Sequence, residues 1–567
     1  DLAIYLDSYK RHQTFARLTS GDIVRLDEGA RAAFGLAEDL GVDAVDLLDG
    51  VSLPASSTLF VDSMLARTPA LDADRDAAFR RTVERLDTLG KMDFTVPASL
   101  KATLRGYQVD GYQWLGSLEH LGLGGILADD MGLGKTLQMI AHILARVEAD
   151  DIKPTLVVCP ASLVYNWTAE LERFAPSLDV CAIVGVKAQR RVQIAGAAEH
   201  NVVVTSYDLM RRDIDEYAEQ DFARVVLDEA QYIKNPLTQV ARAAKRLPAG
   251  VRFALTGTPI ENRLSELWSI FDFLMPGLLG TRESFAKRFE SPVEHAEGDS
   301  AARLQALVSP FVLRRVKEDV VADLPEKIED TVMAQLTGEQ RKLYLANQDR
   351  IAQQVQHREA SEFKKDKLKV LAELTKLRQI CCDPHLHYED YKAGSAKLDA
   401  CMELVHGALD GGHHILLFSQ FTGMLDIIGK RLAKEDIGFL KLTGASSKES
   451  RAKMVAQFQA GEVPVFLISL KAGGVGLNLT AADVVIHYDP WWNVAAQDQA
   501  TDRAHRIGQQ HTVTVYKLIA KDTIEERIMQ MQESKRDLVN SVLGGDGISS
   551  ALFTREDVLA LLGGDGR

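Results

Sequence analysis

Two stretches of this chain alternate short apolar, β-branched runs with segments of helical periodicity, and this alternation constrains the fold more than any other feature. Such runs, bounded by helical patterns, are typical of parallel sheets that helices cover on both faces. The first stretch, from about residue 100, contains the runs 155–160, 201–206, 223–230 and 253–258. The second contains the runs 413–421, 463–469, 482–489 and 513–519. The pattern therefore predicts an α/β protein with two parallel sheets.

The segments outside these stretches have a helical pattern, and they complete the expected domain organisation. At roughly 100–200 residues per domain, a chain of 567 residues is expected to form three to five units. The expected parts are an acidic helical N-terminal module at 1–95, a first α/β domain at 96–275, a helical insertion at 276–390, a second α/β domain at 391–545 and a C-terminal tail at 546–567.

The composition excludes some classes of protein. The chain carries 66 Lys and Arg against 80 Asp and Glu, and this net charge of −14 argues against a protein that coats nucleic acid through its overall charge. No apolar run approaches the roughly 18 residues of a membrane-spanning helix, so no membrane partner is expected. Five cysteines without a CxxC pair predict neither a disulfide framework nor a zinc site, and they fit a reducing compartment. A start at Asp1 without an initiator Met fits a fragment.

The strongest local signal is a glycine-rich loop at 129–136, between an apolar run and a helical pattern. In such a loop, backbone N–H groups and the helix dipole bind phosphates. We expect Lys135 to reach the β- and γ-phosphates and the Thr136 hydroxyl to ligate Mg²⁺. Asp129 departs from the pattern, because the general formula has its first glycine there. The remaining loop residues expected to bind the nucleotide are Asp130, Met131, Gly132, Leu133 and Gly134.

An acidic pair, Asp228 and Glu229, ends the apolar run 223–230 roughly ninety residues after this loop. Two carboxylates at a strand end beside a phosphate-binding loop suit metal binding and activation of water. We expect Asp228 to hold Mg²⁺ and Glu229 to act as general base. The alternative is an ordinary solvated helix start.

Two arginines near the end of the second α/β stretch are candidates for the positive charge that phosphoryl transfer requires. Arg503 and Arg506 are three residues apart, which would place them on one side of a helix. The alternative is a surface helix that carries ion pairs.

These motifs form an ordered set that resembles the Swi/Snf-type ATPase family of superfamily 2, helicase-like DNA translocases. The resemblance covers about 430 of the 567 residues. In the first half the matching segments are 104–108, 129–136, 159–167, 228–231, 255–268 and 311–327. In the second half they are 377–384, 418–426, 469–493, 499–509 and 523–535, the last resembling the family's C-terminal brace helix.

The resemblance implies two RecA-like lobes that hold ATP between them, so that Arg503 and Arg506 act from the second lobe. It adds Gln108 as the residue that reads the adenine and Gly476 as a further nucleotide contact. By motif match, the residues expected to contact DNA phosphates are Ser162, Thr205, Ser206, Ser419, Gln420, Lys471, Gly473 and Trp492. The alternatives are that residues 205–208 only cap the following helix and that Trp492 only packs on its neighbours.

Two departures from the family pattern stand out. Gln231 occupies a position that is usually His in the family and that generally couples the nucleotide site to other motifs. The segment 381–384 reads Cys-Cys-Asp-Pro where Cys-Asn-His-Pro is more usual in the family, and we interpret Cys381 and Cys382 as packing residues because adjacent cysteines lack metal-ligand spacing.

The function that the resemblance implies is a DNA-stimulated ATPase with ATP and Mg²⁺ as cofactors. It would act as a monomeric motor that moves along double-stranded DNA without base readout or strand separation and displaces bound proteins. Two alternatives stay open: a factor that recycles RNA polymerase, and a nucleotide-gated DNA-binding scaffold with weak hydrolysis. The acidic helical start resembles bacterial relatives, so a prokaryotic, cytoplasmic and nucleoid-associated member is expected.

Overall fold

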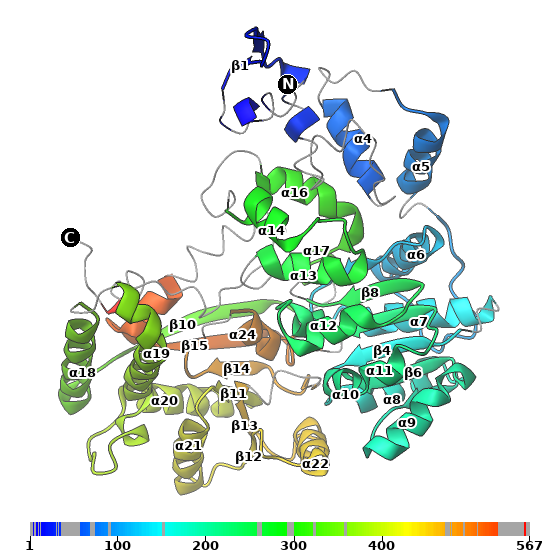
Figure 1. Ribbon diagram of the computed structural model, residues 1–567. Helices are drawn as coiled ribbons and strands as arrows, with labels where there is room; N and C mark the ends of the chain where they lie inside the picture. Colours follow the sequence, from blue (N-terminus) through cyan, green and yellow to red (C-terminus); the bar gives the residue numbers. More distant parts are fainter. Residues whose placement is uncertain are drawn as a thin grey trace. The chain divides into compact units, whose positions relative to one another are not determined.

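The computed structural model divides into two compact units (Figure 1), with main segments Asp1–Asp130 and Gly134–Val320 in the first and Val321–Asn540 in the second. The structure describes residues 4, 7–9, 11, 13–29, 31, 33–35, 57–67, 74–88, 92–149, 153–257, 264–291, 300–320, 325–356, 360–470, 477, 479–491, 494–506, 509–530 and 561–562. Each unit contains one parallel sheet, as the apolar runs predict.

The sheet of the first unit has seven parallel strands in the order β5-β6-β4-β7-β8-β3-β9. Its strands are β3 (Gly125–Leu127), β4 (Thr155–Cys159), β5 (Val180–Ala182), β6 (Val202–Ser206), β7 (Arg224–Asp228), β8 (Val251–Leu255) and β9 (Val312–Leu313). Every residue of β4, β6 and β7 is buried, which is why the middle of each strand is a run of consecutive apolar residues and does not alternate with polar ones.

The helices of the first unit follow its strands, as parallel connections require. They are α6 (Gly106–His120), α7 (Lys135–Glu148), α8 (Val164–Phe174), α9 (Lys187–Ala195), α10 (Tyr207–Arg212), α11 (Ile214–Tyr217), α12 (Gln239–Arg246), α13 (Leu264–Leu274), α14 (Arg282–Phe285), α16 (Ser300–Val308) and α17 (Lys317–Val320). The short helical turns are η2 (Ala197–Glu199), η3 (Ala230–Ile233), η4 (Ala286–Glu290) and η5 (Ser309–Phe311).

The N-terminal module contains the expected helices, α4 (Thr58–Arg67) and α5 (Ala77–Asp87). It also contains a small antiparallel hairpin of β1 (Phe15–Arg17) and β2 (Ile23–Arg25), two strands that the sequence analysis did not predict. Each strand has only three residues, which is too short for period-two alternation to be recognised.

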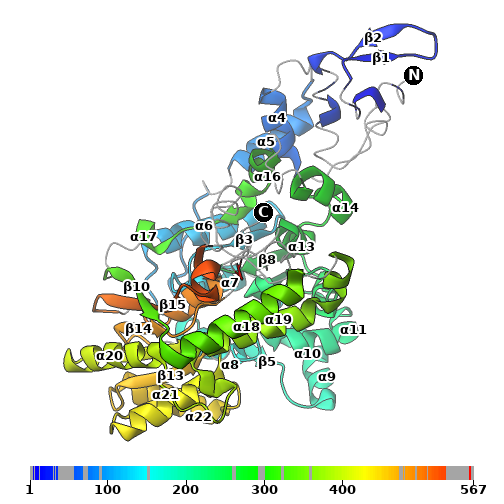
Figure 2. The same cartoon turned by 90° about the vertical axis from the view of Figure 1, so that its left-hand side faces the viewer.

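The sheet of the second unit has six parallel strands in the order β10-β15-β14-β11-β13-β12. They are β10 (Lys327–Gln335), β11 (Ile415–Ser419), β12 (Phe439–Leu442), β13 (Val465–Ser469), β14 (Val484–His487) and β15 (Val513–Lys521). The helical elements are α18 (Gly338–Gln356), α19 (Ala360–Cys382), η6 (Pro384–Leu386), α20 (Ala396–Asp410), α21 (Thr422–Lys434), α22 (Lys448–Gln459) and α24 (Val494–Thr501). Figure 2 shows α18 and α19 side by side.

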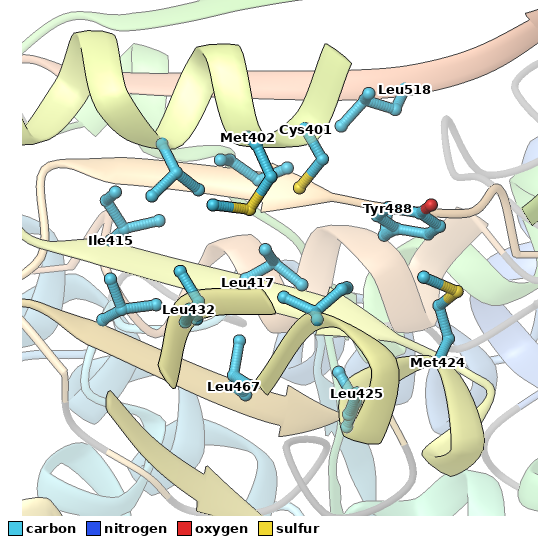
Figure 3. Packing of buried hydrophobic residues seen from close by; sticks show 14 of the residues in the cluster. Cys401, Met402, Ile415, Leu417, Met424, Leu425, Leu432, Leu467, Tyr488 and Leu518 are labelled. Atoms are coloured by element: carbon cyan, nitrogen blue, oxygen red, sulfur yellow. The ribbon is translucent and has the colours of Figure 1, made fainter. Parts of the chain in front are cut away.

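Two hydrophobic cores cover the two faces of this sheet, because successive strand residues point to opposite sides. Ile415 and Leu417 of β11 face one core together with α20 and α21, as Figure 3 shows. Leu416 and Phe418 of the same strand face the other core, with side chains from α22 and α24. Burial on both faces fixes the register of the strand.

The range 276–390, expected to be a helical insertion, contributes strands to both sheets. Strand β9 pairs with β3 in the first unit, and β10 pairs with β15 in the second. The sequence pattern missed β9 because it has two residues, and it missed β10 because this edge strand carries mainly polar, exposed side chains. Cys381 and Cys382 at the end of α19 are both fully buried, in agreement with a packing role.

A buried ion pair ties the segment after β15 to α20. Lys397 Nζ lies 3.0 and 2.8 Å from the two carboxylate oxygens of Glu525, and both side chains are fully buried. Burial acts to lower the pKa of Lys397, but the charge and hydrogen bond of Glu525, together with the charges of Cys382 and Asp489, raise that pKa above its usual value. Glu525 also accepts the backbone N–H of Ala520 at 2.9 Å, so its carboxylate has several donors.

Candidate nucleotide-binding site

The glycine-rich loop leaves β3 after Leu127 and enters α7 at Lys135. Gly132 and Gly134 have φ angles of 86° and 79°, a left-handed backbone that favours glycine. Gly134 is the residue before α7, so the free N–H groups of the first helical turn follow it directly. A loop of this shape at a helix N-terminus is suited to binding an anion.

The two side chains expected to act from this loop lie at the start of α7. Lys135 Nζ donates to the carbonyl oxygens of Asp129 and, at 3.2 Å, of Asp130, so its ammonium group is held over the loop. Thr136 is half-buried in the first turn of the helix.

The acidic pair lies at the same edge of the sheet as the loop. Asp228 ends β7, and its Cα is paired with Leu255 of β8, which is paired in turn with Leu127 of β3. With strands about 4.8 Å apart, Asp228 therefore lies about 10 Å across the sheet from the residue where β3 ends. The parallel sheet thus brings together the two motifs that sequence spacing alone only suggested.

Asp228 is almost fully buried and held by two donors. Its carboxylate accepts the indole N–H of Trp167 at 2.8 Å and the backbone N–H of Glu229 at 2.9 Å. Burial, followed by the charge of Glu229, raises the pKa of Asp228 to about 7, although Trp167 and Lys135 act to lower it. A carboxylate in this state gains stability from an added positive charge.

Glu229 adopts a left-handed φ of 52°, one of three non-glycine residues in the described part of the chain with positive φ. Its carboxylate accepts the side-chain amide of Gln231 at 2.7 Å, and the carbonyl of that amide accepts the Thr256 hydroxyl at 2.9 Å. Gln231 therefore links the expected general base to the segment 255–268, although His is usual in the family at this position.

Gln108 lies against the loop, as expected for a nucleotide-reading residue. It is buried at the start of α6, where its side-chain carbonyl accepts the Arg105 N–H at 3.0 Å. A Cβ atom added at Gly134 would come within 2.5 Å of the Gln108 side-chain nitrogen. The absence of a side chain at Gly134 therefore lets Gln108 approach the loop.

Asp129, the departure from the general loop formula, is fully buried and paired with a residue that sequence reasoning missed. The guanidinium of Arg315 donates to the Asp129 carboxylate, at 2.8 Å for Nε, and to the side-chain carbonyl of Gln138, also at 2.8 Å. It also donates to the backbone carbonyl of Tyr107. A buried carboxylate needs a positive partner, so Asp129 itself was the signal that a distant cation exists.

The arginine candidates belong to the second unit, and one expectation about them was wrong. Helix α24 ends at Thr501, so Arg503 and Arg506 lie in the turns that follow and not on one side of a helix. Two contacts outside the helix hold the segment that follows it. The Leu479 N–H donates to the Arg503 carbonyl at 3.0 Å, and the ring nitrogen Nε2 of His505 lies 2.8 Å from the carbonyl of Pro325. Arg503 is 3% exposed, whereas Arg506 is half-buried.

The residues expected to contact DNA differ in exposure. Ser162 is exposed before α8, and Gln420 is half-buried with its side-chain carbonyl bonded to Arg378 at 3.2 Å.

The other described candidates for DNA contact, Thr205, Ser206 and Ser419, are buried at strand ends. Ser206 caps α10, the alternative noted for 205–208, and Ser419 donates to Asp489 at 2.5 Å. Lys471, Gly473, Gly476 and Trp492 lie outside the described residues.

A phosphate-binding loop and an acidic pair at one edge of a parallel sheet define the class of P-loop α/β proteins. Family models match nearly the whole chain. The bacterial SNF2 helicase-associated domain matches residues 1–97, the SNF2-related domain 107–386 and the helicase conserved C-terminal domain 396–508. The chain belongs to the SNF2 family.

Relatives with curated descriptions agree with this family. An uncharacterized ATP-dependent helicase of Mycoplasma pneumoniae is 40% identical over 81% of this chain and 44% of its own length. The putative ATP-dependent helicase/translocase YwqA of Bacillus subtilis is 39% identical over 92% of this chain and 58% of its own length. The chain thus spans about half the length of these relatives.

Among solved structures, the Sulfolobus solfataricus SWI2/SNF2 ATPase core in complex with dsDNA is 38% identical over 80% of this chain and 95% of that chain, with a TM-score of 0.42. Within the described residues, no helix is long and apolar enough to cross a membrane.

Proposed function

We propose that this protein hydrolyses ATP and uses the energy to move along duplex DNA and displace bound proteins. One observation gives the main support for hydrolysis. Leu127, Leu255 and Asp228 are register partners on three neighbouring strands, so the phosphate-binding loop and the acidic pair lie at one edge of one sheet. Lys135 would bind the β- and γ-phosphates, and Glu229, aligned by Gln231, would take the proton of the attacking water.

The donor set fits a magnesium ion. Asp228 is a buried carboxylate whose pKa is raised to about 7, and the hydroxyl of Thr136 is at the loop end nearest the helix. Oxygen donors of this kind suit Mg²⁺, which keeps several waters and the phosphates as its other ligands. Bound there, the ion would neutralise charge on the phosphates.

The DNA-directed part of the proposal rests on family membership and on the order of the motifs along the chain. The Bacillus relative is described as a putative helicase/translocase, which supports movement on nucleic acid. Ser162 and Gln420, the more exposed of the described candidates, would contact phosphates and would not read bases. The buried Thr205, Ser206 and Ser419 would shape the strand ends that present them.

Steady-state ATP hydrolysis with duplex DNA, single-stranded DNA and no DNA tests this function. We expect duplex DNA to raise the rate many-fold, and we expect Glu229→Gln to lower it at least about a hundredfold because the general base is lost. Glu219→Gln is the matched control, since Glu219 is exposed in the same unit, and its rate should equal that of the wild type. A wild-type rate indifferent to nucleic acid would refute the motor, and a fully active Glu229→Gln variant would refute the site.

A further inference from the structure

The side chain of Arg315 sits in a cage built by three separate segments. Besides Asp129 and Gln138, the cage includes Tyr107, whose ring centroid lies 5.2 Å from the guanidinium carbon. Asp129 and Gln138 are fully buried, and the Arg315 side chain is 12% exposed. The segments are the glycine-rich loop, helix α7 and the start of α6, the same three that carry the nucleotide residues.

Helix α6 is shaped to admit this guanidinium. A Cβ atom added at Gly111 would come within 1.9 Å of the Gln138 side-chain oxygen and 2.7 Å of Arg315 Nη2. A real Cβ cannot occupy that position unless the neighbours shift. Gly111 therefore leaves the space that the Arg315–Gln138 contact fills.

The backbone around Arg315 is also fastened to the loop. The Ala128 N–H donates to the Leu313 carbonyl at 2.7 Å, and the Asp130 N–H donates to the Arg315 carbonyl at 3.0 Å. The Lys317 N–H donates to the Asp130 carboxylate at 3.2 Å. The backbone of β9 and of the residues that follow it thus continues to form hydrogen bonds with the start of the loop, as a neighbouring strand would.

We propose that Arg315 is a positioning residue of the nucleotide site: it holds the phosphate-binding loop, through Asp129, in register with the adenine-reading segment, through Tyr107. Gln108 follows Tyr107 directly and lies against Gly134, so one guanidinium fixes both nucleotide-facing parts relative to each other. This inference rests on the proposed function, because it assigns Arg315 to the same site. This role of Arg315 also explains why Asp129 stands where the general loop formula has glycine, since a glycine would offer Arg315 no carboxylate.

The test is equilibrium binding of a fluorescent ADP analogue, N-methylanthraniloyl-ADP, to the full chain. We expect Arg315→Ala to raise the Kd about tenfold or more, and Arg315→Lys to raise it by less, because lysine keeps the charge but loses the forked contact. Asp129→Asn should resemble Arg315→Ala. Gly111→Ala, which crowds the cage without removing a charge, should also weaken binding.

The matched control is Arg190→Ala. Arg190 forms a buried, two-pronged pair with Asp213 in the same unit, and it also donates to the Gly185 carbonyl at 2.7 Å. Its described hydrogen-bond partners, Asp213 and Gly185, are not nucleotide residues, so its loss should lower the melting temperature and change the Kd by less than twofold.

If Arg315→Ala lowered the melting temperature as Arg190→Ala does but bound the analogue as tightly as the wild type, Arg315 would be structural only and the inference would be overturned. Because ADP binding needs no hydrolysis, this outcome is separate from the failure of the proposed function. That failure would show as a wild type that binds nucleotide and does not hydrolyse ATP.

Discussion

Arg506→Ala is expected to reduce the rate of ATP hydrolysis by about 10³–10⁵-fold, the contribution that an arginine on the transferred phosphate makes elsewhere. Negative charge on the phosphate oxygens must be stabilised in the transition state, and Arg506 would supply the countercharge from the second unit. Arg506 is half-buried, whereas Arg503 is 3% exposed. Arg506 is therefore the better residue to remove without unfolding its surroundings.

Nucleotide and duplex DNA binding by Arg506→Ala should stay near wild type, because the countercharge acts mainly in the transition state. Arg431→Ala is the matched control, since Arg431 is likewise a half-buried arginine of the second unit, and its described ion pair is with Glu435, the residue that follows its helix. A variant Arg506→Ala that bound both ligands normally and hydrolysed at full rate would show that the assignment is wrong. Loss of hydrolysis in Arg503→Ala alone would move the role to Arg503.

Glu525→Gln is expected to destabilise the second unit by about 3–5 kcal/mol, the usual cost of breaking a buried ion pair on one side only. The substitution keeps the shape of the side chain but leaves the charge of Lys397 buried without a countercharge. The effect should appear as faster hydrogen exchange of peptides from α20 and from the segment after β15 that carries Glu525, while peptides from the first unit are unchanged.

Two controls accompany this variant. Asp426→Asn breaks the exposed pair with Lys441 and should cost no more than about 1 kcal/mol. The double variant Lys397→Met, Glu525→Leu removes both charges and should recover most of the loss, because paired apolar replacements of buried ion pairs are often neutral. Unchanged exchange in Glu525→Gln would contradict the view that this pair holds the segment after β15.

The fold was predictable from sequence where strands are buried on both faces. Six strands consist mainly of consecutive apolar residues: β4, β6, β7, β11, β13 and β14. In β11, for example, Ile415 and Leu416 face opposite hydrophobic cores, so both positions are apolar. β10 escaped prediction because an edge strand with exposed Ile328 and Met333 and several charges has no hydrophobic pattern to recognise. β9 escaped because two residues form no pattern at all.

The placement of Lys135, Asp228 and Glu229 at or shortly after strand ends was predictable, because a single segment carries each motif. The site was not predictable where pairing is long-range, since Arg315 and Asp129 are 186 residues apart and no local spacing connects them. Trp167 and Thr256 likewise act by contacts with Asp228 and Gln231 that only the folded sheet creates. Spacing also misled in one case: Arg503 and Arg506 are three residues apart, but α24 ends at Thr501, before both of them.

We propose that hydrolysis drives movement along intact duplex DNA. The release of a third strand from a DNA triplex is a direct measure of such movement. A motor that moves on the duplex and contacts only its backbone strips the third strand as it passes and leaves the two duplex strands paired. We expect ATP-dependent release of the third strand by the wild type, no release by Glu229→Gln, and no separation of a forked duplex. Duplex-stimulated hydrolysis without release of the third strand would contradict this proposal.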